Sequence, residues 1–162
     1  MSLKSRLVSI ASVTGLIVLV SGCAAVGIGG TVDTRWADFK TWDKVTDGQT
    51  GDPTKFIGNV HRGPSGFRNV YVNASGLETI NDESEGRVFP AGAIVIKEQF
   101  KNEAAWKSGK GGGYTVMIKQ EDGQWGWTDS LKGKAGPSAF CAGCHGIAAK
   151  HDAVFTGGGY EN

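Results

Sequence analysis

The pattern of apolar and polar positions changes along the chain, from helical spacing near the start to alternation in the middle. Within Arg35–Val45, Trp36, Phe39 and Trp42 recur near helical spacing, which predicts one amphipathic N-terminal helix. Asp47–Pro53 is rich in turn-forming residues, so we expect a break in regular structure after that helix.

Alternation with a period of two then predicts strands. It runs through Asn69–Asn73 and Tyr114–Lys119, and Gln124–Thr128 returns as the partner of the latter. Ala93–Glu98 is predicted as a further strand, short and buried, that turns polar at its end. Turn residues at Phe89–Gly92 precede this strand, and Glu121–Gly123 form a hairpin turn between Tyr114–Lys119 and its partner. We therefore expect at least four strands in antiparallel order.

The remaining segments are short. Leu77–Gly86 is compatible with a short helix or an acidic loop, and Ala104–Gly113 reads as a loop with a glycine-rich end. Ser138–Lys150 predicts a short helix close to the C-terminus. The predicted fold class is α+β: a mostly antiparallel β-sheet with an N-terminal helix and a short, chemistry-bearing C-terminal helix.

The first residues have the order of a secretory signal. Met1–Arg6 is basic, Leu7–Val20 is apolar, and small residues lead to Cys23. The apolar run is short for a spanning helix, which needs about 20 apolar residues. Val20–Cys23 resembles the lipobox of bacterial lipoproteins, in which the cysteine becomes lipidated after cleavage.

An ordinary signal that leaves Cys23 as an unmodified thiol is the alternative. Lipidation is preferred because a lone cysteine is reactive in an oxidising compartment. The resulting division is a signal peptide (1–22), a flexible glycine-rich tether (23–34) and one domain (35–162). Such an anchor would hold the domain on the periplasmic side of a bacterial membrane, with the outer membrane favoured because Ala24 follows the cysteine.

Charge excludes some functions. Without Lys4 and Arg6, 15 of the 17 basic residues remain against 16 acidic residues. The domain therefore has no basic stripe for nucleic acid, and no second apolar stretch long enough to span a membrane.

The segment Cys141–His145, CAGCH, carries the strongest chemical signal. Two thiols three residues apart lie on one face of a helical turn, where both can reach the vinyl groups on one edge of a porphyrin. His145 is then placed under the ring, where its imidazole can bind the iron. The motif predicts one covalently bound haem c.

Three other interpretations of the CAGCH motif fit the sequence less well. A thioredoxin-type Cys-x-x-Cys expects a βαβ context. A structural zinc site needs more ligands, of which His151 could supply one. A disulfide between Cys141 and Cys144 would leave His145 unexplained.

The sixth position of the iron has no obvious protein ligand. Only 17 residues follow His145 and none is methionine. Met117 lies in a predicted strand as core packing, His151 is too close along the chain to cross the ring, and His61 is more typical of a loop or surface residue. An open iron binds small molecules, whereas a six-coordinate iron mostly passes electrons.

Beyond the motif, the chain resembles the cytochrome P460 and cytochrome c′-beta family. The resemblance rests on the block Phe89–Glu98, FPAGAIVIKE, combined with the C-terminal CxxCH, and extends to Trp42, His61, Arg68–Asn73 and Trp127. It implies a mostly antiparallel β-sheet, usually in a homodimer, with a five-coordinate c-type haem. The P460 proteins oxidise hydroxylamine and carry an extra bond from a lysine to the porphyrin. The c′-beta proteins lack that bond, have distal phenylalanines, and bind NO or CO.

The resemblance implies further site residues. Lys97 is the candidate for the cross-linking lysine, or else a solvent-facing strand lysine. Glu121 and Asp122 are candidates for the carboxylate that moves protons, or else solvated turn residues.

Phenylalanines and one arginine complete the set. The candidates for an apolar distal wall are Phe56, Phe67, Phe89 and Phe100, each of which could instead be core packing. Arg68 could reach a haem propionate or the distal pocket, or lie on the surface.

Three functions follow in order of preference. The first is a hydroxylamine oxidoreductase that passes electrons to a periplasmic acceptor. The second is a non-catalytic protein that binds NO or CO. A simple electron carrier is the least favoured, because the axial methionine is missing.

Overall fold

The computed structural model describes residues 31–50 and 67–156. The predicted signal peptide, Cys23, most of the predicted tether, Phe56 and His61 lie outside the described residues. No helix within the described ranges is long and apolar enough to cross a membrane.

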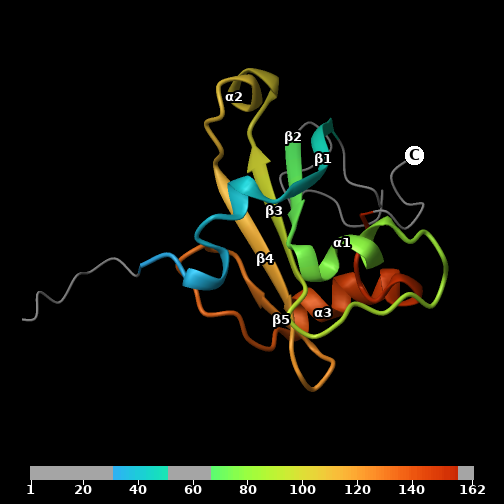
Figure 1. Ribbon diagram of the computed structural model, residues 1–162. Helices are drawn as coiled ribbons and strands as arrows, with labels where there is room; N and C mark the ends of the chain where they lie inside the picture. Colours follow the sequence, from blue (N-terminus) through green and yellow to red (C-terminus); the bar gives the residue numbers. More distant parts are fainter. Residues whose placement is uncertain (1–30, 51–66, 157–162) are drawn as a thin grey trace, which may run out of the picture.

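A five-stranded antiparallel sheet organises the domain (Figure 1). Its strands, which neighbour one another in chain order, are β1 (Asp43–Thr50), β2 (Phe67–Val72), β3 (Ile94–Phe100), β4 (Gly113–Lys119) and β5 (Trp125–Thr128). The four predicted strands are confirmed, as is their antiparallel order.

β1 is the strand that the sequence did not predict. It covers Asp47–Thr50, where we expected a break, and its pairing with β2 is irregular at two places. At one of them Gly48 has φ +70° and donates its N–H to the Asn69 side chain at 2.9 Å. Turn-forming residues are compatible with an edge strand that bulges, which is why the composition suggested a break.

Short helices connect and flank the strands. They are the 3-10 turns η1 (Thr34–Trp36) and η2 (Phe39–Thr41), the helices α1 (Ala74–Asn81), α2 (Glu103–Lys107) and α3 (Ala139–His145), and the 3-10 segment η4 (Gly146–His151). The C-terminal helix is thus present as α3 and η4, and α1 shows that the acidic segment begins as a helix. α2 lies where a loop was predicted, and its five residues are too few to show periodicity.

The predicted N-terminal helix over Arg35–Val45 is not confirmed. η1, η2 and the start of β1 occupy these residues. Trp36 and Phe39 are three residues apart, a spacing that 3-10 turns satisfy as well as an α-helix does. Trp36 is fully buried, and its indole N–H donates to the Leu131 carbonyl at 2.8 Å.

Alternation along the strands gives the sheet two buried faces. On one face, Trp36 and Phe39 pack with residues of β2, β3 and β4 such as Tyr71, Ile96 and Val116. On the other face, the buried residues come from the sheet, α1, the FPAG turn and the C-terminal segment, namely Val70, Val72, Ile80, Phe89, Ala93, Val95, Met117, Trp125 and Val154. The second face is the one that α3 approaches.

Candidate functional site

The helix α3 brings both thiols and the imidazole to one wall of the domain. Ser138 caps the helix by accepting a hydrogen bond from the Cys141 N–H at 3.2 Å. Just before it, Gly136 and Trp127 exchange backbone hydrogen bonds of 2.8 and 3.1 Å, which fixes the start of the segment beside β5. Cys141 and Cys144 are both free thiols, half-buried on successive turns.

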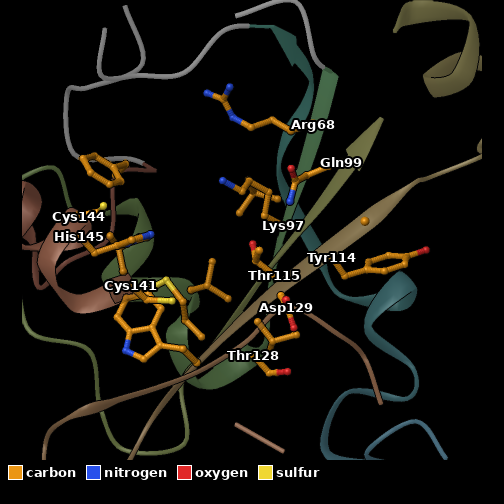
Figure 2. Close-up of a pocket in the computed structure, with 18 of the residues that line it drawn as sticks. Arg68, Lys97, Gln99, Tyr114, Thr115, Thr128, Asp129, Cys141, Cys144 and His145 are labelled. Atoms are coloured by element: carbon orange, nitrogen blue, oxygen red, sulfur yellow. The ribbon is translucent and has the colours of Figure 1, made fainter. Parts of the chain in front are cut away.

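Between α3 and the sheet lies a cavity of about 740 Å³, which we call the α3 cavity (Figure 2). This is within the usual range for a small-molecule or cofactor site. Its wall on the helix side includes Cys141, Cys144 and His145. Of the two histidines in the described part of the chain, His145 lines this cavity and His151 is buried elsewhere in η4.

The Ala153 carbonyl determines that the Nδ1 nitrogen of His145 is a hydrogen-bond donor. Nδ1 lies 2.7 Å from the Ala153 carbonyl oxygen, which can only accept, so Nδ1 carries the proton. In the neutral ring this leaves the lone pair on Nε2, the nitrogen that a metal would bind. The ring packs against Trp127 and Phe155, with centroids 4.6 and 5.2 Å away, so its orientation is fixed as well.

The sheet side of the α3 cavity is apolar near one end and polar near the other. The apolar part includes Val70, Val95, Met117 and Trp127. The polar part comes from cross-strand neighbours, Arg68 opposite Gln99 and Lys97 opposite Thr115. Figure 2 shows the Lys97 and Arg68 side chains extending from the strands into the cavity.

The structure brings five of the sequence-predicted site residues together. Arg68, Lys97, Cys141, Cys144 and His145 all line the α3 cavity. Arg68 and Lys97 share a face because the strand register places Arg68 and Gln99 side by side and Lys97 two residues before Gln99.

The predicted phenylalanines do not line this cavity in the described part of the chain. Phe67 stacks on Trp106 with ring centroids 5.6 Å apart. Phe89 is 1% exposed and packs edge-on against Trp125 at 5.4 Å, and Phe100 is also buried. The phenylalanines at the cavity are instead Phe140 and Phe155.

Glu121 and Asp122 also lie away from the α3 cavity. They form the β4–β5 turn, where Asp122 accepts from the Gln124 N–H at 2.9 Å, and they border a separate hollow beside β5. The carboxylate at the α3 cavity is Asp129, which is exposed and follows β5 directly.

Sequence reasoning missed Gln99, Thr115 and Asp129. Strand alternation could have found Gln99, because it lies two residues after Lys97 and so shares its face. Asp129 had no local signal, because only the folding of α3 over β5 brings this residue to the cavity.

A buried carboxylate on the opposite face supports β3 behind Lys97. Glu98 is 1% exposed, forms an ion pair with Lys40 and accepts from the hydroxyls of Tyr71 and Tyr114, each at 3.3 Å. Burial, followed by the charge of Glu98, raises the pKa of Tyr114. Burial alone would lower the pKa of Lys40, but the hydrogen bond and charge of Glu98 outweigh it and raise that pKa.

The sequence matches a family model described as Cytochrome P460 over residues 36–156, which is well over half of the chain. The chain belongs to the cytochrome P460 family. None of the curated proteins matches it significantly. As a cytochrome P460 it is a c-type cytochrome, and it binds one haem c covalently.

The residues of the α3 cavity fit this cofactor. Two thiols on one helix can reach a porphyrin edge, and the imidazole beside them is oriented through the contact between its Nδ1 and the Ala153 carbonyl. The apolar part of the wall suits a porphyrin face, and Arg68 offers a cation for a propionate. No other part of the described chain combines two thiols with a cavity.

Proposed function

We propose that this protein is a mono-haem P460-type hydroxylamine oxidoreductase. Cys141 and Cys144 would form the thioethers to the haem, and His145 would bind its iron. The observation that carries the proposal is that Lys97 lines the same cavity as His145, on the sheet wall that faces α3. A lysine at this position can reach the porphyrin, as the P460 cross-link requires.

A haem held here would supply the redox chemistry and a metal that can bind a small molecule. The protein's own side chains orient the haem ligand and contact the substrate. His145 stays oriented between Trp127 and Phe155. Lys97, Gln99 and Thr115 give the sheet wall hydrogen-bonding groups for a small polar substrate such as hydroxylamine.

Oxidation of hydroxylamine releases protons together with electrons, so the site needs a base. Asp129 is the carboxylate at the α3 cavity, and its exposure connects it with solvent. We assign it the proton-accepting role that the resemblance alone suggested for Glu121 and Asp122.

Binding of NO or CO without turnover is the second candidate. The observation that favours it is the apolar part of the wall around Val70, Val95 and Met117, which would admit a neutral diatomic molecule. Lys97 and Gln99 on the polar part of the wall favour the enzyme over this candidate, because gas binding alone does not need these two groups.

The cellular setting is also part of the proposal. The basic, apolar and small-residue order of the first 22 residues supports export, and Val20–Cys23 supports lipidation of Cys23. The protein would then act on the periplasmic side of a bacterial membrane, the outer membrane being favoured. It would act as a homodimer that delivers electrons to a periplasmic acceptor.

Steady-state turnover tests the proposal. Purified haem-loaded protein is mixed with hydroxylamine and an oxidised dye, and reduction of the dye is followed. We expect turnover that Lys97→Leu lowers at least about 100-fold, in the range of a lost transition-state interaction. Lys101→Leu is the matched control, because Lys101 is exposed just beyond the end of β3 and should leave the rate unchanged.

The same sample separates the two candidates. CO or NO binding without hydroxylamine turnover would favour the gas-binding function and contradict the enzyme. Equal rates in the Lys97→Leu and unchanged proteins would remove Lys97 from the account.

A further inference from the structure

Two consecutive residues beside His145 have backbone conformations that side chains disfavour. Asp152 has φ +52° and Ala153 has φ +64°, and neither is glycine. Left-handed backbone is unfavourable for residues that carry a Cβ and persists only where surrounding contacts hold it. A pair of such residues next to a functional histidine calls for a physical reason.

The contacts that hold this turn come from the sheet and from the FPAG turn. The Asp152 carboxylate accepts from Lys119 Nζ at 2.7 and 2.8 Å and from the Phe89 N–H at 2.8 Å. The Asp152 carbonyl accepts from the Trp125 indole N–H at 2.8 Å. Lys119 is 5% exposed and the Asp152 side chain 15%, so the ion pair is largely shielded from water.

The same turn directs the next carbonyl to the imidazole. The Ala153 oxygen lies 2.7 Å from His145 Nδ1. On its far side the segment is held again, because Arg87 donates to the carbonyls of Val154 and Thr156 at 3.1 and 2.7 Å. The acceptor of His145 is therefore fixed from both directions.

We propose that the buried Lys119–Asp152 ion pair is a positioning pair for His145. It holds the left-handed turn, and the turn holds the Ala153 carbonyl against Nδ1, so the proton stays on Nδ1 and Nε2 faces the cavity. An acceptor at Nδ1 raises the basicity of a metal-binding imidazole. Neither Lys119 nor Asp152 lines the α3 cavity, so the pair acts through His145. The inference rests on the proposed role of His145 as iron ligand, and not on any particular substrate.

A purely structural ion pair would affect stability alone, whereas a positioning pair also changes the iron–histidine bond. Resonance Raman spectra of the ferrous haem-loaded protein report that bond directly. We expect Lys119→Met and Asp152→Asn to shift the iron–histidine stretch to lower frequency and to raise the reduction potential. Lys119→Arg, which keeps the charge, should restore most of the original frequency.

Lys150→Met is the matched control. It removes the lysine charge from another ion pair, Lys150–Glu85, whose side chains are 69% and 66% exposed. Lys150 lies on η4, which directly precedes the left-handed turn. We expect its iron–histidine stretch to equal that of the unchanged protein. Folded Lys119→Met and Asp152→Asn proteins with an unshifted stretch would overturn the proposal.

A measurement on the unchanged protein applies even where the variants do not fold. Proton NMR of the ferrous form should show an exchangeable Nδ1 proton of His145 that is protected from exchange with heavy water. Rapid exchange of this proton would overturn the positioning role. Hydroxylamine turnover does not enter either readout, so the inference and the proposed enzyme activity fail separately. Absence of any iron–histidine band in the unchanged protein would overturn both the pair and the ligand assignment.

Discussion

At the scale of single residues, the hydrogen bond to one imidazole nitrogen decides which nitrogen faces the α3 cavity. The Ala153 carbonyl accepts a hydrogen bond from His145 Nδ1–H, and the neighbouring rings of Trp127 and Phe155 fix the ring plane. A hydrogen bond at the second ring nitrogen fixes the tautomer and the ring orientation of a metal-binding histidine.

Asp129 gives the first prediction at this scale. Asp129→Asn removes the proton acceptor at the cavity, so we expect hydroxylamine turnover to fall about 100-fold, as is typical for loss of a general base. CO binding to the ferrous protein should be unchanged, because it needs no proton transfer. Asp122→Asn is the control, since Asp122 lies in the β4–β5 turn. A larger loss in Asp122→Asn than in Asp129→Asn would reverse the assignment.

Gly48 gives a second prediction, for stability. A Cβ at Gly48 would lie 2.4 Å from the Trp106 ring, and its φ of +70° already disfavours a side chain. Gly48→Ala should lower the free energy of unfolding by at least about 2 kcal/mol, from backbone strain and overpacking together. Gly86→Ala has a similar φ of +87° but open space around it, so we expect a loss of only about 1 kcal/mol. Urea titration compares the two, and equal losses would exclude a role for the Trp106 contact.

At the scale of elements, one asparagine joins α1 to the strand that carries Lys97. The Asn73 side chain accepts from Gly76 N–H at 3.3 Å as the helix cap and from Ile94 N–H at 2.9 Å at the start of β3. It also donates to the Gly92 carbonyl at 2.9 Å. The FPAG turn and β3 are therefore positioned by the same residue that begins the helix.

Asn73→Ala should lower the free energy of unfolding by about 2–3 kcal/mol, because it removes a cap and leaves partly buried backbone groups unpaired. Asn102→Ala is the matched control, since Asn102 only caps α2 through the Ala105 N–H at 2.9 Å in an exposed setting. We expect Asn102→Ala to lower the free energy of unfolding by about 1 kcal/mol. Thermal or urea unfolding measures both, and a smaller loss at Asn73 than at Asn102 would contradict the double role.

The same elements show what the sequence could predict. β2, β4 and β5 could be predicted from alternation and β3 from its short apolar run, and the CAGCH helix because its spacing is local. β1 was missed because Gly48 and the polar residues around it suit a bulged edge strand and a turn alike. Trp36 and Phe39 have a spacing common to α-helix and 3-10 turns, so only their packing on the sheet decides between the two. Asp129 and Ala153 reach the site through tertiary contacts, which no local pattern records.

At the scale of the whole molecule, one face of the sheet lines the α3 cavity and the other carries a buried polar network. Lys97 faces the α3 cavity, while its neighbour Glu98 faces the opposite side and gathers Lys40, Tyr71 and Tyr114. β3 is thus held from behind by a buried polar network while its other face lines the cavity. A network of this kind is rigid as long as every member is satisfied.

That network predicts how stability depends on pH. The pKa of Tyr114 is raised by burial and by Glu98, so the folded state holds the phenolic proton more tightly than the unfolded state. The pKa of Lys40 is raised as well, so its contribution is present below its unfolded pKa and is lost as pH rises through the folded one. Both effects have the same sign, and stability should fall above about pH 10.

Tyr114→Phe removes one of the two groups. We expect the free energy of unfolding, measured by urea titration from pH 8 to pH 11, to fall less steeply in this variant than in the unchanged protein. An identical slope in both proteins would show that Tyr114 ionises equally in the folded and unfolded states.

The most direct test of the central claim is the mass of the haem-bearing peptides after proteolysis of the purified protein. The claim is that a covalent haem fills the cavity between α3 and β3 and meets both Cys141–His145 and Lys97. We predict one haem that joins the peptide containing Cys141 and Cys144 to the peptide containing Lys97. Recovery of an unmodified Lys97 peptide, with haem on the two cysteines alone, would contradict the P460-type enzyme.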